Sequence, residues 1–234
     1  MTAADPGRPA PRRLGILLPS SNTVVEPETM RLLPRDGTVT AHFSRLGVTL
    51  ISDDAASRDQ FAPPAMLQAA QLLADAEVDL IAWAGTAASW LGFERDEALA
   101  AAIAGRCGIA ATSSVIAINR RLAALGARRI GLVTPYVAAL EARIVANYRA
   151  IGIDTAAADR LDLTVNTDYG RVPPAAIAAQ CRRVASARPD AIVVMCTNLQ
   201  GAPIAAAVAA ETGIPVLDSV AVTVAHCVER LGPA

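Results

Sequence analysis

The amino-acid sequence repeats itself once, and this repeat constrains the fold more than any other feature of the chain. Three segments of the first half recur in the second, in the same order and at similar separations: residues 13–19 and 129–135, residues 78–86 and 189–197, and residues 108–115 and 213–220. Three ordered matches are hard to attribute to chance. We therefore expect two halves of the same fold, related by an approximate two-fold axis.

Short apolar runs alternate with longer Ala-, Leu- and Arg-rich stretches of helical spacing, a pattern typical of strand–helix units around a parallel sheet. Strands are expected over residues 14–18, 39–43, 80–84, 130–134, 191–195 and 215–217. Helices are expected over residues 64–76, 95–106, 114–125, 137–150, 174–187 and 202–212. The sequence thus predicts an α/β fold of two pseudo-symmetric, doubly wound parallel-sheet halves. Because such sheets bind ligands at the carboxyl ends of their strands, we expect the site in the cleft between the halves.

The 234 residues are 53% hydrophobic, which suits a globular chain with a large core. Residues 1–12 are polar and Pro-rich, and we expect them to form a disordered leader. Residues 13–118 are expected to form the first half and residues 119–234 the second. We leave open that the C-terminal segment of the first half crosses over to the other half.

Charge and composition exclude several classes of protein. Lys and Arg total 21 against 22 Asp and Glu, so the chain lacks the basic excess of a nucleic-acid binder. Its apolar runs are shorter than the roughly 20 residues that span a bilayer, and no apolar signal region follows the N-terminus. Four separated cysteines without a CxxC pair indicate reduced thiols, and two histidines argue against a metal site. We expect a cytoplasmic monomer or homodimer without metal, cofactor, nucleic-acid or membrane partner.

Cys196 is the strongest candidate for chemistry, because it ends an apolar strand and is followed by Thr197 and Asn198. Backbone N–H groups near a helix terminus would lower its pKa below the usual value of about 8.5. A buried core cysteine is the ordinary alternative, and the commoner fate of this residue type. In the repeat, Gly85 takes the place that Cys196 holds in the second half.

The other segments that follow strands are small or polar. Residues 19–23, PSSNT, offer hydroxyl, amide and backbone N–H groups for a carboxylate, although Thr23 with Glu26 also fits a helix capping box. Thr86 and Tyr136 each supply a hydroxyl, and Asn166 lies in a loop-like stretch that is long enough for a lid. Each also has an ordinary reading as a turn or core residue. Three aromatic residues near Gly85 line an apolar pocket or pack in the core: Trp83, Trp90 and Phe93.

These segments resemble the maleate isomerase and arylmalonate decarboxylase branch of the aspartate/glutamate racemase superfamily. The resemblance runs from Gly15 to about Val224 and is carried by residues 15–23 (GILLPSSNT), 133–136 (VTPY) and 195–198 (MCTN). It implies that Asn22, Tyr136 and Asn166 contact a substrate carboxylate. It also implies that Cys196 is catalytic.

At residue 85 the sequence departs from the pattern of the racemases and maleate isomerases. Racemases and maleate isomerases of this group use two thiols, whereas arylmalonate decarboxylases have Gly-Thr at the first position and keep only the second cysteine. Gly85, Thr86 and Cys196 look like the latter, which implies a cofactor-independent decarboxylase of a substituted malonate. Thr86, Tyr136 and backbone N–H groups near Ala87 and Thr197 would form an anion hole for an enediolate that Cys196 protonates.

Other features keep alternatives open. Ala87 stands where the decarboxylases carry a hydroxyl residue, and Asn22 and Asn166 resemble the isomerases. The alternatives are a maleate cis-trans isomerase or an Asp/Glu-type racemase of a small dicarboxylate, and a non-catalytic carboxylate-binding protein. In each case the expected ligand is a small mono- or dicarboxylate.

Overall fold

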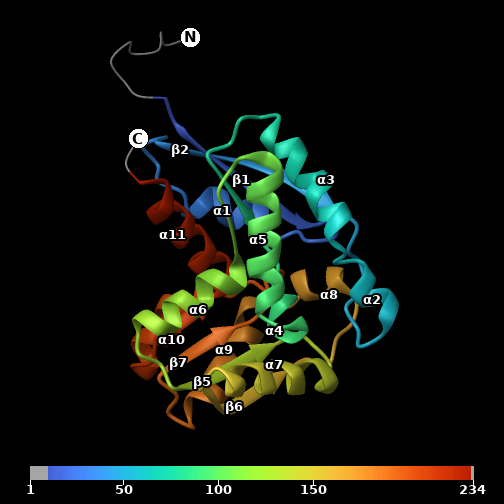
Figure 1. Cartoon of the computed structure of the whole chain (residues 1–234). Helices are drawn as coiled ribbons and strands as arrows, with labels where there is room; N and C mark the ends of the chain where they lie inside the picture. Colours follow the sequence, from blue (N-terminus) through green and yellow to red (C-terminus); the bar gives the residue numbers. More distant parts are fainter. Residues whose placement is uncertain (1–9, 233–234) are drawn as a thin grey trace.

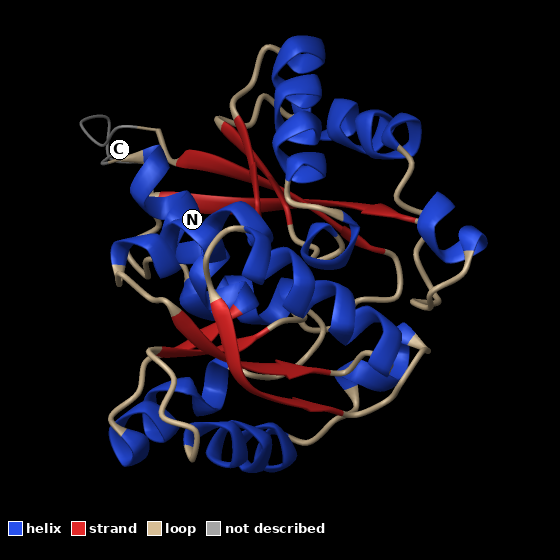
Figure 2. Ribbon diagram, turned by 60° about the horizontal axis from the view of Figure 1, so that its bottom comes forward, coloured by secondary structure: helices blue, strands red, loops and turns tan. Residues whose placement is uncertain are grey.

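The computed structural model describes residues 10–232, and within them the chain forms two four-stranded parallel sheets flanked by helices. The strand orders are β2-β1-β3-β4 and β6-β5-β7-β8, so the second sheet repeats the first strand for strand. One sheet lies in each half of the molecule, and helices lie both between the sheets and on their outer faces (Figures 1 and 2). The predicted α/β fold of two doubly wound halves is confirmed.

The elements of the first half are β1 (Arg12–Pro19), α1 (Val25–Leu32), β2 (Val39–Leu46), α2 (Ala55–Asp59), α3 (Pro63–Ala74), β3 (Leu80–Trp83), α4 (Ala88–Leu91), α5 (Glu94–Cys107), β4 (Ala111–Ser113) and α6 (Ser114–Ala124). Those of the second half are β5 (Arg129–Thr134), α7 (Ala138–Ala150), β6 (Asp154–Arg160), α8 (Asn166–Gly170), α9 (Pro174–Ala185), β7 (Ala191–Val194), α10 (Ala202–Thr212), β8 (Val216–Asp218) and α11 (Ser219–Leu231).

The repeated residues have the same structural role in both halves. Asp79 accepts a hydrogen bond from the backbone N–H of Arg13 at 2.6 Å, and Asp190 accepts one from that of Arg129 at 2.8 Å. Each carboxylate thereby ties the start of one central strand to the start of its neighbour. Gly15 lies on β1, where a Cβ would come within 2.9 Å of the Val78 side chain, so a larger residue would push the covering layer away from the sheet.

Helix α11 joins the two halves. It follows β8 of the second sheet, yet Val220, Val224 and Cys227 are buried in the core of the first sheet. It also packs against α6, and Thr223 donates a hydrogen bond to Ser114 at 2.8 Å. The two helices lie between the sheets in Figure 1. The expected boundary between residues 118 and 119 falls inside α6, so that helix spans the boundary.

The strands expected from apolar runs are present, with ends that differ by three residues at most. Two strands were missed because neither has an apolar run: β4, whose three residues are Ala, Thr and Ser, and β6, a partly exposed edge strand. The expected leader was wrong at Arg12, which opens β1 by pairing with Val39; residues 1–9 lie outside the described part. No helix within residues 10–232 is long and apolar enough to cross a membrane.

Candidate active site

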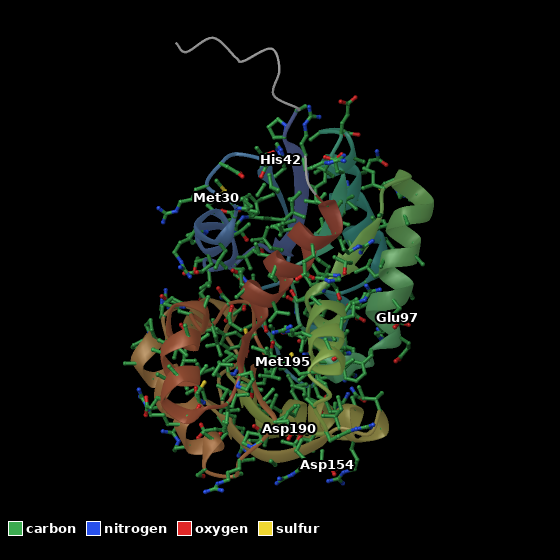
Figure 3. The ribbon with its side chains drawn as sticks, turned by 90° about the vertical axis from the view of Figure 1, so that its left-hand side faces the viewer. Met30, His42, Glu97, Asp154, Asp190 and Met195 are labelled. Atoms are coloured by element: carbon green, nitrogen blue, oxygen red, sulfur yellow. The ribbon has the colours of Figure 1, made fainter. Side chains whose placement is uncertain are left out.

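A small cavity lies where the carboxyl ends of the central strands of both sheets meet. Pro19 at the end of β1 lines it, and the segments after β3, β5 and β7 supply the stretch from Gly85 to Ala87, Tyr136, and Cys196 with Thr197. Met195, directly before Cys196, lies in the interior, whereas Asp190 and Asp154 lie at the far end of the second half (Figure 3). The doubly wound topology therefore brings together residues more than 100 positions apart.

Cys196 is buried, with 3% of its surface exposed. Its Sγ accepts a hydrogen bond from the backbone N–H of Asn198 at 3.4 Å. Burial raises the pKa of this thiol to about 12, although the N–H groups of Asn198 and Leu199 and the hydroxyl of Tyr136 act in the opposite direction. The expectation of a lowered pKa was wrong, because five residues separate Cys196 from α10 and desolvation outweighs the nearby donors. Cys196 is thus a neutral thiol at pH 7.

Thr86 and Tyr136 join the two halves beside this thiol. Their hydroxyl oxygens are 2.7 Å apart, and either can be the donor. Burial, followed by the neighbouring Cys196, raises the pKa of Tyr136 well above its usual value, so its phenol stays protonated. Among the described residues, no backbone hydrogen bond uses the N–H groups of Thr86, Ala87 or Thr197. Thr86, Ala87, Tyr136 and Thr197 all line the cavity, so these hydroxyl and N–H groups are available as donors to a ligand there.

Asn22 was expected to contact the ligand, but it lies behind Thr197 and is not among the residues that line the cavity. Its side-chain oxygen accepts hydrogen bonds from the N–H groups of Val24 and Val25 at 2.9 and 3.0 Å, so Asn22 stabilises the start of α1. The expected capping box was wrong, since Glu26 instead pairs with Arg45 at 2.9 Å. The side-chain amide of Asn22 donates to the Thr197 hydroxyl at 3.3 Å. Asn22 therefore orients a cavity residue without lining the cavity itself.

Asn166 lines the cavity from the second half. It begins α8, so part of the expected loop is helical. Its side-chain amide donates to the Ser21 hydroxyl at 2.7 Å, and its carbonyl accepts from the amide of Asn198 at 2.6 Å. The backbone directly before Asn166 is tied to the first half, with an antiparallel bridge between Leu50 and Val165. This bridge holds a segment of each half together.

Trp83 closes the cavity beside Gly85. A Cβ added to Gly85 would lie 2.2 Å from the indole Cζ2 atom, well inside any allowed contact. The cavity itself has a volume of about 20 Å³, close to that of a single water molecule. Of the aromatic residues expected to line it, Trp83 and Trp90 do so, but Phe93 does not. Phe93 packs on Tyr148 instead, with ring centroids 5.1 Å apart.

Sequence reasoning missed three residues that shape the site. Phe61 packs edge-on against Trp83 and Trp90, and Ile51 also lines the cavity. Both come from the segment after β2, which has no periodic pattern to mark it. Asn198 donates to Asn166 and accepts from the backbone N–H of Thr23 at 3.0 Å. Its place directly after Cys196 and Thr197 was the one available signal.

The remaining cysteines lie away from this cavity. Cys181 and Cys227 are buried, Cys107 is partly buried, and all four thiols of the chain are free. Within residues 10–232, no cluster of three or more His, Cys, Asp or Glu side chains is arranged to hold a metal ion.

Known proteins share this arrangement over nearly the whole chain. A maleate isomerase of Nocardia farcinica is 31% identical over 218 residues, which cover 89% of this chain and 85% of that one. The solved structure of a Nocardia farcinica maleate cis-trans isomerase variant, with a covalently bound succinylcysteine intermediate, has a TM-score of 0.85 at 27% identity, covering 95% and 93% of the two chains. Unliganded arylmalonate decarboxylase has a TM-score of 0.79 at 22% identity, covering 95% and 94%.

Two parallel-sheet halves with a thiol in the cleft place the protein in the aspartate/glutamate racemase-like superfamily, in the maleate isomerase and arylmalonate decarboxylase branch. The chain belongs to the arylmalonate decarboxylase family, whose model matches residues 14–234. The resemblance inferred from the sequence motifs is therefore confirmed.

Proposed function

We propose that the protein is a cofactor-independent decarboxylase of a small substituted malonate, in which Cys196 is the proton donor. The observation that carries this proposal is the space beside Gly85. The Trp83 indole fills it, so the cavity holds one thiol and has no room for a second at residue 85. A single neutral thiol suits protonation of a carbanion better than it suits chemistry that needs two thiols or a thiolate.

The reaction uses hydroxyl and N–H donors of the residues that line the cavity. One substrate carboxylate accepts hydrogen bonds from Thr86, Tyr136 and the N–H groups of Thr86, Ala87 and Thr197. The bond to the second carboxylate breaks, CO₂ leaves, and its bonding electrons form an enediolate. The donors stabilise the charge that develops on the enediolate oxygens. Cys196 then gives its proton to the carbon, and water reprotonates the thiolate.

The surroundings of the cavity favour this step. Ile51, Phe61, Trp83 and Trp90 form an apolar wall, and an apolar environment destabilises a carboxylate more than neutral CO₂. The raised pKa of Cys196 keeps its proton in place until the enediolate forms. Since one group delivers the proton, it reaches one face of the enediolate, and a malonate with two different substituents is expected to give a product enriched in one enantiomer.

Maleate cis-trans isomerisation is the second candidate, and the names of the relatives favour it over decarboxylation. The curated proteins that match at 31%, 27% and 28% identity are all maleate isomerases. Asn166 in the cavity and Asn22 behind Thr197 also fit the isomerase resemblance. In this chain the isomerase would have to form and release a covalent adduct, or move a proton, with Cys196 as its only cavity thiol.

Product analysis separates the two candidates. The purified protein, without added cofactor, is incubated with methylmalonate, phenylmalonate and maleate, and products are followed by liquid chromatography and CO₂ release. Decarboxylation that is lost in Cys196→Ala supports the first proposal. Fumarate formed from maleate, with no CO₂ from either malonate, would overturn it in favour of isomerisation. Cys181→Ala is the matched control, because that thiol is buried away from the cavity.

A further inference from the structure

Trp83 separates the catalytic cavity from a larger apolar groove. On one side of the indole lies the cavity of about 20 Å³ with Cys196 and Thr86. On the other side, a groove of about 290 Å³ is lined largely by apolar side chains of α3 and α5, with Met66 and Leu99 among them. The two spaces share three lining residues: Phe61, Trp83 and Ala87. A thin wall of side chains is therefore all that divides them.

The indole of Trp83 is the largest side chain in this wall. Trp83 is 1% exposed and is held by Phe61, whose ring meets it edge-on with centroids 6.4 Å apart. Its six-membered ring covers Gly85, and Ala87 contributes only a methyl group. Any substituent on the reacting carbon that points toward Gly85 would meet the indole first. Without the indole, the same substituent would reach the groove.

We propose that Trp83 determines substrate specificity: its indole blocks the way from the cavity to the groove between α3 and α5 for a substituent on the carbon that Cys196 protonates, and its truncation lets an aryl group pass into that groove. This inference rests on the proposed function, since it concerns the substrate of the same site.

The volumes show that the groove, unlike the cavity, has room for an aryl ring. A closed apolar cavity of about 150 Å³ is enough to hold benzene in another protein. The groove of about 290 Å³ exceeds that size, whereas the cavity of about 20 Å³ falls far below it. Most of the groove lining is apolar and matches an aryl ring, although Arg95 and Asp96 also line it.

The test measures binding, so that it does not depend on turnover. Propanoate and phenylacetate, the monoacids of methyl- and phenylmalonate, are titrated by calorimetry into the wild type, Trp83→Ala and Trp83→Leu. Trp83→Leu keeps an apolar side chain in the core and serves if the alanine variant does not fold. Leu99→Ala is the control, because it enlarges the groove without touching the wall.

We expect phenylacetate to bind at least tenfold more tightly to the Trp83 variants than to the wild type or Leu99→Ala, with propanoate affinity changed less than threefold. Adding Thr86→Val to a Trp83 variant should lower its phenylacetate affinity, because the carboxylate then loses one of its donors. Equal phenylacetate affinity in the wild type and the Trp83 variants, or an affinity that Thr86→Val leaves unchanged, would overturn the inference. If phenylacetate affinity rises as expected while no malonate is decarboxylated, the proposed function fails and the role of Trp83 stands.

Discussion

The indole of Trp83 occupies the space into which any side chain on residue 85 would project. Trp83 is the last residue of β3, and Gly85 follows two residues later. An ideal Cβ on Gly85 would lie 2.2 and 2.4 Å from two ring carbons of the indole. In the second half of the repeat, Val194 takes the place of Trp83 and Cys196 that of Gly85. The large indole of Trp83 is therefore compatible only with a residue that has no side chain at position 85. The first half of the site has no thiol at this position, whereas the second half has Cys196.

This pairing predicts the outcome of restoring a thiol at residue 85. Gly85→Cys should lower the free energy of unfolding by about 1–3 kcal/mol, because the new side chain overlaps the indole. Adding Trp83→Ala should remove part of that penalty, so the two changes should not be additive. Urea unfolding measures both effects. Gly47→Cys is the control, since no atom lies within 4 Å of a Cβ there, and a loss as large as that of Gly85→Cys would contradict the explanation.

Cys196 should act as a proton donor over a wide range of pH. Because burial raises its pKa to about 12, the thiol stays protonated up to strongly alkaline pH. We expect kcat/KM for the decarboxylated malonate to show no loss between pH 7 and 9 from this group. Cys196→Ala should lower kcat by about 10²–10⁴-fold, the usual contribution of a general acid, with little change in KM. A rate that rises with pH as a thiolate forms near pH 8 would contradict a donor role.

Tyr136 should contribute to the stabilisation of the enediolate. Tyr136→Phe removes one donor and leaves the Thr86 hydroxyl without its partner at 2.7 Å. We expect kcat to fall by about 10²-fold, in line with the loss of one oxyanion-hole donor. Tyr148→Phe is the matched control, because that tyrosine is also buried but donates to Asn119 outside the cavity. Equal losses in the two variants would point to a general effect of packing.

Asp96 should make the protein less stable as the pH rises. Its carboxyl is buried, one oxygen lacks a partner among the described residues, and burial raises its pKa to about 7. In the unfolded chain the pKa is about 3.9, so the folded protein binds more protons between these values. The contribution is complete below pH 4 and is lost as the pH rises through 7.

The slope attributable to Asp96 should approach about 1 kcal/mol per pH unit, since one proton accounts for at most ~1.36. Asp96→Asn should lack this contribution, so its free energy of unfolding should gain on the wild type between pH 5 and 8. Urea unfolding at pH 5, 6.5 and 8 tests this. Parallel pH dependences of the free energy of unfolding in the wild type and Asp96→Asn would show that Asp96 does not cause the loss of stability.

The repeat allowed most of the architecture to be predicted. Asp79 and Asp190 recur because each ties two strand starts together, and such local hydrogen bonds leave a pattern in the sequence. The apolar runs of β1, β3, β5 and β7 are buried central strands, which is why they were recognisable. Strand β6 was missed because an edge strand with partly exposed residues needs no such run.

The sequence by itself determined the two parallel-sheet halves, the meeting of their strand ends, and the candidacy of Cys196, Thr86, Tyr136 and Thr197, because strand topology follows from local patterns. Only the tertiary structure decided the environment of these residues. Burial reversed the expected shift in the pKa of Cys196, and Trp83 closed the space beside Gly85. Desolvation and exclusion of volume depend on atoms from both halves at once, and no local pattern in the chain records them.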